Sequence, residues 1–322
     1  MKVSVVVPTF NRGRALAATV ERLAASRLDP EDDLEIVVVD DGSSPPAQEV
    51  ASSALHASPW PVRWLRQANA GPAAARNAGF RATRGEITLF VDDDILVPPQ
   101  LVRAHVAAHR ARPGTVVFGA CPFPPGRGSR AFRAFLAGAG EAPDSAPDSL
   151  LPAPVVASGQ ISMERAQFDD ATGVYASDMV TPAAEEYELS LRLRHRGISV
   201  LSAPGIVAEH DQPVDIGSYC RQQYKHGVGC GEAASRRPEL LELGELARII
   251  EATRSRGVAK GLLARRPARE LLTSLARALE RFPVPSRLRV AAYRAAVTAH
   301  FVAGVRDGCA RFSARREVTP SC

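Results

Sequence analysis

Residues 85–94 read GEITLFVDDD, an apolar segment that runs directly into three consecutive aspartates. Four other short segments in the first 120 residues are similarly rich in Val, Ile and Leu: 3–7, 34–39, 62–65 and 116–118. Continuous apolar runs of this length are typical of strands buried on both faces, as in a parallel sheet. Stretches with helical periodicity separate them, at 14–26, 47–57, 72–83 and 98–110. The alternation predicts an α/β fold with a mostly parallel sheet flanked by helices.

The remainder of the chain departs from this alternation in two ways. Residues 122–157 are rich in Pro, Gly and Ala, which predicts a long loop or lid beside a site. Mixed structure follows, with a helix near 183–196 and strands near 198–201 and 206–208. From about residue 213 the pattern is helical, with breaks expected at Pro238, Pro267, Pro283 and Pro285. We therefore expect a catalytic domain at 1–212 and a basic α-helical region at 213–322.

The charge of the chain is divided unevenly between these parts. The 322 residues carry a net charge of +5, but residues 1–220 hold 20 Lys and Arg against 26 Asp and Glu. Residues 221–322 hold 20 against 9. Nucleic-acid binding through the basic part is disfavoured because it contains few aromatic side chains for stacking on bases. Two alternatives remain for residues 221–322: their arginines form a solvated basic face, or they dock on an anionic lipid surface.

Cysteine usage and apolar runs bear on where the protein works. The five cysteines are scattered and form no CxxC pair, so neither a disulfide framework nor a zinc site is expected. The first eleven residues do not fit a signal peptide, and no segment approaches the roughly 18 apolar residues of a membrane span. These features favour the cytoplasm.

Polar side chains follow the strands of the expected sheet, where ligands bind in such folds. Thr9 and Asn11 follow the first strand, Asp41 the second, and Asp92, Asp93 and Asp94 the fourth. In an extended segment Asp92 and Asp94 would share a face while Asp93 points elsewhere. Carboxylate oxygens suit Mg²⁺ or Mn²⁺, which commonly bridge to substrate phosphates. The sequence therefore predicts a metal and diphosphate site at this edge.

Three further features leave alternatives open. Arg76 is either a surface helix residue or a cation for a diphosphate, and Gly71 precedes a helix whose N–H groups could face an anion. His210 closes a short strand, where a metal-ligand role and a structural role are equally well supported. Glu185 and Glu186 begin a second acidic cluster, which by itself fits an amphipathic helix with solvated charges.

Taken together, these residues resemble the inverting family 2 glycosyltransferases of the GT-A fold, from Val3 to about His210. The resemblance rests on seven segments in the family's order: VSVVVPTFNR (3–12), EIVVVDDGSS (35–44), NAGPAAARNAGF (69–80), GEITLFVDDD (85–94), SGQISMERAQF (158–168), EEYELSLRLRHRG (185–197) and VAEH (207–210). It implies a GT-A, Rossmann-like sheet with a C-terminal helical extension. It also implies transfer of a sugar from a nucleotide-sugar to an acceptor hydroxyl, with inversion and with Mn²⁺ or Mg²⁺.

The resemblance also implies roles for individual residues. Donor contacts are expected from Pro8, Thr9, Asn11, Arg12, Asp41, Gly71, Arg76, Asp92 and Asp93. The segment 92–94 resembles the family's DxD motif, with Asp94 as the direct metal ligand, joined by Asp92 and His210. Glu186 falls where the family's "ED" motif places its general base. Arg221 and Tyr224 resemble a later R-x-x-Y segment that contacts the acceptor or diphosphate.

One departure from the family pattern keeps other functions in view. The chain has Glu185-Glu186 where the family usually has Glu-Asp, so either glutamate could be the base. A catalytically impaired nucleotide-sugar-binding or scaffold protein is one alternative. A nucleotidyltransferase is another, although the Gly-rich phosphate loop expected after the first strand is absent.

The resemblance leaves the substrates themselves open. The donor is expected to be a UDP-, GDP- or dTDP-sugar. The acceptor is unknown, with lipid-linked, envelope and natural-product acceptors all in view. Such acceptors are consistent with peripheral contact at the inner face of the membrane through residues 221–322.

Overall fold

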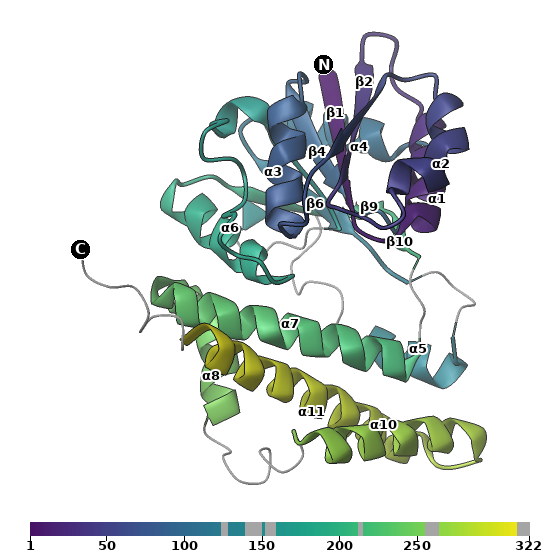
Figure 1. The fold of residues 1–322 in the computed structure, drawn as a ribbon, viewed down its shortest axis with the longest axis vertical. Coiled ribbons are helices and arrows are strands. Elements are labelled where there is room, and N and C mark those ends of the chain that lie inside the picture. The colour runs from purple at the N-terminus through teal and green to yellow at the C-terminus, as the bar shows by residue number, and fades with distance from the viewer. Residues whose placement is uncertain (124–127, 139–149, 152–158, 212–214, 255–263, 314–322) are drawn as a thin grey trace. The chain divides into compact units, whose positions relative to one another are not determined.

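The computed structural model describes residues 1–123, 128–138, 150–151, 159–211, 215–254 and 264–313 (Figure 1). The chain divides into two compact units. The first comprises Met1–Pro124, Ala142–Val180 and Leu189–Gln212. The second comprises Pro125–Glu141, Thr181–Glu188 and Pro213–Cys322.

The first unit is built on an eight-stranded sheet in the order β3-β2-β1-β4-β8-β6-β9-β7. Its strands are β1 (Lys2–Thr9), β2 (Asp33–Asp40), β3 (Val62–Arg66), β4 (Ile87–Val91), β6 (Val116–Ala120), β7 (Leu150–Leu151), β8 (Gln160–Glu164) and β9 (Val200–Val207). Six of these strands run in one direction. The other two, β7 and β8, run antiparallel to the strands beside them. The expected mostly parallel sheet is therefore confirmed.

Helices cover both faces of this sheet, which explains the continuous apolar runs of its strands. On one face, α1 (Gly13–Ala24), α2 (Ala47–His56) and α4 (Leu101–Ala111) pack against side chains such as Val5 and Val38. On the other face, α3 (Pro72–Ala82) and the Leu189 and Leu193 side chains of α6 (Ala184–His195) pack against Val6 and its neighbours.

Two details of the sheet differ from the sequence expectation. Residues 198–201 and 206–208 do not form two strands, because β9 runs without interruption from Val200 to Val207. Strand β8 was not foreseen, and it lies antiparallel between β4 and β6. Its insertion separates two strands that the βα alternation alone would place side by side.

The segment 122–157 is not wholly a loop, which corrects the expectation for its described part. It contains α5 (Arg130–Gly138) as well as β7, while 124–127, 139–149 and 152–158 lie outside the described residues. Helix α5 belongs to the second unit, where Phe132 stacks on Phe135 and packs edge-on against Tyr293 with ring centroids 5.1 Å apart. Burial of these aromatic rings stabilises the helix.

Beyond residue 213, the described part of the second unit is helical apart from short connections, as expected. It contains α7 (Ile216–Arg236), the 3₁₀ helix η2 (Pro238–Leu243), α8 (Glu245–Arg254), α10 (Arg266–Arg281) and α11 (Ser286–Ser313). The expected breaks are found: α7 ends just before Pro238, and Pro283 and Pro285 lie between α10 and α11. Pro238 and Pro267 themselves lie in the first turns of η2 and α10, because proline has no N–H to lose there. Among the described residues, no helix has the length and apolarity to cross a bilayer.

Glycines bring α7 and α11 together at very short range. A Cβ on Gly227 would lie 2.3 Å from the Phe301 carbonyl oxygen, and one on Gly231 would lie 2.5 Å from that of Val305. From the other helix, a Cβ on Gly304 would lie 2.1 Å from the Tyr224 oxygen. The two helices therefore run parallel with their backbones in contact, and each glycine removes a clash that any side chain would create.

The Gly304→Ala variant tests this contact. We expect it to lower the free energy of unfolding by about 2 kcal/mol, since overpacking against a backbone oxygen outweighs the better helix propensity of alanine. Gly205→Ala is the matched control, because a Cβ there meets nothing within 4 Å. Urea unfolding followed by circular dichroism at 222 nm measures both; equal midpoints would contradict the close packing.

Two buried histidines on α4 join the helix to β8 in a polar network. His105 Nδ1 and His109 Nε2 each lie 2.8 Å from the Ser162 hydroxyl, and His105 Nε2 lies 3.0 Å from Gln160 Oε1. Gln160 Nε2 donates to the carbonyl oxygens of Ala120 and Ile206. Burial lowers the pKa of both His105 and His109 to about 4.

These pKa values predict a loss of stability in mild acid. Below pH 6.5 these histidines become protonated in the unfolded chain, whereas in the folded protein they stay neutral until about pH 4. The free energy of unfolding therefore falls as the pH falls through this interval. His105→Gln should reduce the loss of unfolding free energy between pH 6.5 and 4.5 by up to about 2 kcal/mol. Urea titrations at several pH values measure how the unfolding free energy depends on pH. The same dependence in the wild type and in His105→Gln would contradict the lowered pKa of His105.

Candidate metal and nucleotide-sugar site

The three consecutive aspartates form a turn at the end of β4. Ile95 N–H donates to the Asp92 carbonyl oxygen at 3.2 Å, and the Thr19 hydroxyl of α1 holds the turn through the carbonyl oxygens of Asp93 and Ile95. The backbone is not extended here, so the expected alternation of side chains is not the cause of their grouping. The turn nevertheless brings Asp92 and Asp94 together, while Asp93 points elsewhere.

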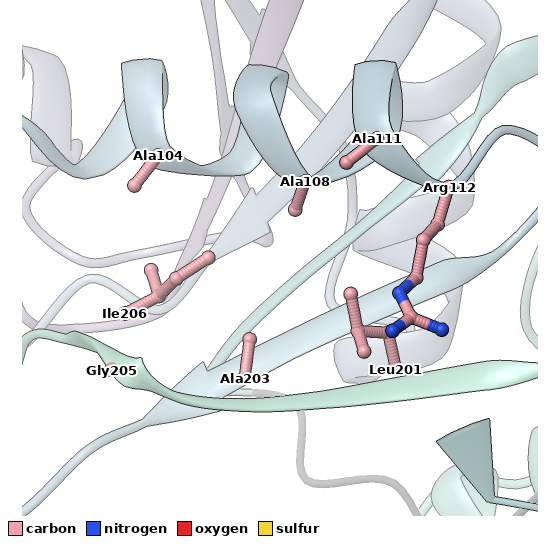
Figure 2. A pocket seen from close by; sticks show the side chains of 8 residues that line it. All are labelled: Ala104, Ala108, Ala111, Arg112, Leu201, Ala203, Gly205 and Ile206. Carbon is pink, nitrogen blue, oxygen red and sulfur yellow. The ribbon is translucent and has the colours of Figure 1, made fainter. Parts of the chain in front are cut away.

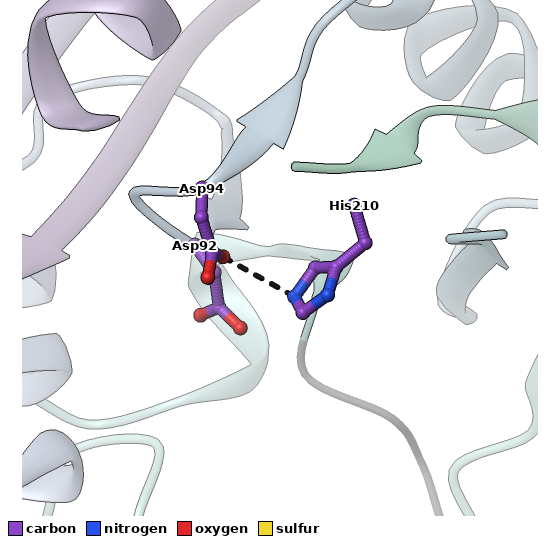
Figure 3. Close-up of side chains that lie close together, drawn as sticks. All are labelled: Asp92, Asp94 and His210. Carbon is purple, nitrogen blue, oxygen red and sulfur yellow. Dashed lines mark ion pairs between the residues drawn. The ribbon is translucent and has the colours of Figure 1, made fainter. Parts of the chain in front are cut away.

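His210 joins Asp92 and Asp94, and one ligand atom from each lies within 4.8 Å of the others (Figure 3). A two-stranded antiparallel pair places it there: His210 of β10 (Glu209–His210) faces Ile95 of β5 (Ile95–Leu96). His210 Nε2 lies 3.2 Å from Asp94 Oδ1. Burial lowers the pKa of His210, but the hydrogen bond and charge of Asp94 outweigh burial and raise it overall.

Two carboxylates and an imidazole in one cluster are a donor set that fits Mn²⁺ or Mg²⁺. Their chemistry favours hard or borderline divalent ions over soft ones, and the small number of protein ligands leaves room for phosphate oxygens. The cluster lies beyond the carboxyl end of a parallel strand, where ligands bind in α/β sheets. The structure thus brings together the three residues for which sequence predicted a metal role.

Asp93 faces the first strand instead. It accepts a hydrogen bond from the Thr9 hydroxyl at 2.6 Å and one from Arg12 at 3.1 Å, and Arg12 also binds Asp94. Burial raises the pKa of Asp93 to about 6, against the lowering effect of Arg12 and with a further raising effect of Asp94. Asp93 therefore ties the β1 loop to the turn that carries the cluster.

Arg76 neutralises Asp92 from the side of α3. Its guanidinium donates to Asp92 Oδ1 at 2.7 Å and lies 5.3 Å from the ring centroid of Tyr175. Only 4% of Arg76 is exposed, so it is not a surface helix residue. Sequence reasoning missed Tyr175 and Thr19, since neither belongs to a motif.

Asp41 organises the loop that opens α3. Its carboxylate accepts hydrogen bonds from the Ala70 and Gly71 N–H groups, both at 2.9 Å, and from the side chains of Gln67 and Asn69. Gly71 has a φ of +93°, a conformation that favours glycine. The structure thus gives Asp41 a positioning role, with four protein donors on its two oxygens.

The β1 loop and the β2 loop are also joined directly. Asn11, with a φ of +56°, receives Ser44 N–H on its side-chain oxygen and donates its own N–H to the Ser43 hydroxyl. Pro8 lies in β1 beside Val39 of β2. All the predicted donor residues of these loops therefore belong to the first unit, at the same edge of its sheet.

The predicted base and acceptor residues belong to the second unit. Glu185 and Glu186 occupy the first turn of α6, where Glu185 is 1% exposed and Glu186 is half-buried. On α7, the Tyr224 hydroxyl donates to Asp307 at 2.6 Å, which raises the pKa of Tyr224, and Arg221 donates to Ser218. Tyr224 is thus engaged within its own unit.

Two other features of the first unit lack the properties of this cluster. A pocket of about 360 Å³ between α4 and β9 is lined mainly by small apolar side chains and has no carboxylate (Figure 2). A second acidic group, Asp29, Glu31 and Asp32, is compensated by Arg110 and the N-terminal ammonium.

Comparison with known proteins agrees with this geometry. Residues 4–144 match the model of the family described as glycosyl transferase family 2. Over these residues the chain is similar to family 2 glycosyltransferases. Among curated proteins, it is 37% identical over 121 residues to validoxylamine A glucosyltransferase of Streptomyces hygroscopicus subsp. limoneus, covering 37% of this chain and 26% of that protein. The chain spans about a third or less of the first such relatives.

Solved structures establish the GT-A fold. The mannosyltransferase PcManGT from Pyrobaculum calidifontis, in complex with GDP-Man and Mn²⁺, has a TM-score of 0.59 and 18% identity, covering 95% of this chain and 86% of that one. S. aureus TarS 1–349 in complex with UDP has a TM-score of 0.53 and 16% identity, covering 100% and 93%. Both likenesses extend beyond residues 4–144.

If Asp92, Asp94 and His210 bind a divalent ion, that ion should stabilise the folded protein, and the effect should depend on Asp94. Mn²⁺ at about 100 times its dissociation constant should raise the unfolding free energy by about 2.7 kcal/mol, because it binds the folded state. Asp94→Asn should abolish most of the rise in melting temperature, whereas Asp29→Asn, in the compensated acidic group, should retain it. Differential scanning fluorimetry with and without Mn²⁺ measures the shifts; equal shifts in the two variants would contradict the assignment.

Proposed function

We propose that this protein transfers a sugar from a nucleotide-sugar donor to an acceptor hydroxyl, with inversion at the anomeric carbon. The observation that carries the proposal is the cluster of Asp92, Asp94 and His210 beyond the carboxyl end of β4, within a family 2 domain. A site of this kind suits an anionic diphosphate that arrives with a divalent cation.

The first unit would hold the donor. Asp94, Asp92 and His210 would bind Mn²⁺ or Mg²⁺, which supplies positive charge to offset that developing on the departing nucleoside diphosphate. Arg76 fixes Asp92, and Arg12 fixes Asp93 and Asp94, so the carboxylates are held before the donor binds. Asp41 shapes the 69–71 loop through its backbone hydrogen bonds, and this loop would line the donor pocket.

A glutamate of α6 would remove the proton from the acceptor hydroxyl as that oxygen attacks. Glu186 is the better candidate because its side chain is half-buried and retains access to solvent, whereas Glu185 is buried. Both lie in the first turn of the helix. A carboxylate at this position is ready to act as a general base.

Only the chemical classes of the donor and the acceptor are proposed. Similar proteins are described as binding GDP-Man with Mn²⁺ and UDP, so UDP- and GDP-sugars are the first donors to test, with dTDP-sugars next. The acceptor is a hydroxyl compound of lipid-linked, envelope or natural-product type. We place the reaction in the cytoplasm, at the inner face of the membrane where the acceptor requires it.

Paired glutamine variants test the base. With a donor identified by thermal shift, Glu186→Gln should lower kcat by about 10²- to 10⁴-fold, the usual effect of losing a general base. Its donor affinity should stay unchanged, and Glu185→Gln should retain transfer. Release of nucleoside diphosphate, measured together with the glycosylated product, gives the rates.

Other outcomes of this experiment count against specific parts of the proposal. Loss of transfer in Glu185→Gln alone would reassign the base. Donor binding without turnover in the wild-type protein would favour a binding or scaffold role, and pyrophosphate as the product would favour a nucleotidyltransferase.

A further inference from the structure

The second unit exposes a cluster of large apolar side chains on α10 and at the start of α11. Leu271, Leu275, Phe282 and Leu288 are 70%, 48%, 60% and 51% exposed. They are half of the eight large apolar side chains exposed in the described part of the chain, yet they fall within 18 residues. Isolated exposed apolar residues are ordinary, but a group so concentrated along the chain points to a surface that binds something. We call these four side chains the apolar ridge.

Helical geometry explains why the ridge faces outward. Leu271 and Leu275 are four residues apart, so they share one face of α10, and Phe282 continues that face at the end of the helix. The opposite face carries Thr273 and Ala276, which are buried within the unit. Helix α10 therefore has a packed face and a second, exposed apolar face that its own fold does not use.

The segment that carries the ridge is rich in arginine, and part of its positive charge has no acidic partner among the described residues. Residues 264–294 contain eight arginines, two glutamates and neither aspartate nor lysine. Both glutamates are occupied, since Glu270 pairs with Arg266 at 2.9 Å and Glu280 accepts the Tyr293 hydroxyl at 2.9 Å. Four exposed arginines make no ion pair within the described residues: Arg265, Arg281, Arg287 and Arg294.

The remaining arginines of this segment have structural roles that separate them from these four. Arg269 lies 5.0 Å from the ring centroid of Tyr224, and Arg277 lies 3.7 Å from Asp215. Arg289 donates to the carbonyl oxygens of Leu279, Phe282 and Val284, and so fixes the turn between α10 and α11. The ridge is thus presented on a braced helical hairpin rather than on a loose end.

We propose that the apolar ridge and the four unpaired arginines form a surface that docks on an anionic lipid bilayer. A helix of this type lies in the plane of the interface, with its apolar side chains among the acyl chains and its basic side chains at the headgroups. Charge complementarity selects this occupant: a second copy of the chain would set unpaired arginines against arginines across a two-fold interface. The proposal is independent of glycosyl transfer.

Vesicle flotation with the full chain tests the surface. At 50 mM NaCl the protein should float with vesicles of 70% phosphatidylcholine and 30% phosphatidylglycerol, and poorly with phosphatidylcholine alone or at 500 mM NaCl. Arg281→Gln/Arg287→Gln should weaken binding at least tenfold, since each arginine near an anionic surface contributes about fivefold. Leu271→Gln/Phe282→Ser should weaken it to a similar degree. All these side chains are exposed, so the thermal unfolding of the variants should match the wild type.

A matched control and a measure of depth complete the test. Val50→Gln/Arg84→Gln changes an exposed valine and an exposed arginine of the first unit and should bind as the wild type does. Phe282→Trp should gain fluorescence that lipids brominated on their acyl chains quench, beyond the quenching of the parent protein's own tryptophans.

Several results would overturn the proposal. They are absence of flotation with anionic vesicles at low salt, ridge variants that bind like the control, and no added quenching in Phe282→Trp. Concentration-dependent self-association of the wild type that Leu271→Gln/Phe282→Ser abolishes would assign the ridge to a second copy instead. Size-exclusion chromatography with light scattering detects that outcome. None of these readouts depends on sugar transfer, so failure here is distinguishable from failure of the proposed enzyme activity.

Discussion

Repulsion among carboxylates at one edge of the sheet is the constraint on which the first unit depends. Five aspartates lie at the carboxyl ends of β2 and β4, and their charges are compensated in three ways. Asp40 and Asp41 accept backbone N–H groups, Asp92 binds Arg76, and Asp93 and Asp94 share Arg12. Like charges this close would otherwise disfavour the folded state. The compensation leaves Asp92 as the most exposed of the five, beside Asp94 and His210.

Sequence predicted the parts of this arrangement that depend on neighbouring residues. It predicted less well the parts that join residues far apart in the chain. The strands and the polar residues that follow them are local signals, so the edge that carries Asp41 and Asp92–Asp94 was predictable. His210 lies 116 residues beyond Asp94, and the two-residue strands β5 and β10 that join them leave no readable pattern. The antiparallel β8 was missed because QISME is short and sits beside a segment without clear periodicity.

Helix α7 has two opposite faces that both rely on glycine, which links the packing of the second unit to the proposed base. Gly227 and Gly231 contact α11, whereas a Cβ on Gly229 would meet the Pro182 carbonyl oxygen at 2.3 Å on the other side. Buried Glu232 accepts the Thr181 N–H at 2.8 Å and pairs with Arg236. These contacts hold the segment that leads through Ala183, with a φ of +77°, into the turn of Glu186. Backbone contacts therefore connect α7 to the segment that leads into that turn.

The use of arginine differs between the units in a way that the net charge of +5 conceals. In the first unit, Arg12 and Arg76 are bound to the carboxylates of the site, so their charge is already neutralised. In the second unit, four arginines beside the apolar ridge have no acidic partner among the described residues. If the arginines of both units were equally free of acidic partners, an anionic donor and an anionic lipid surface would be attracted to the same side chains. The site cations are paired, whereas the four arginines beside the ridge have no acidic partner among the described residues. In the two proposals, attraction to a lipid surface would therefore fall on the second unit, while the first would recruit its donor through a divalent ion.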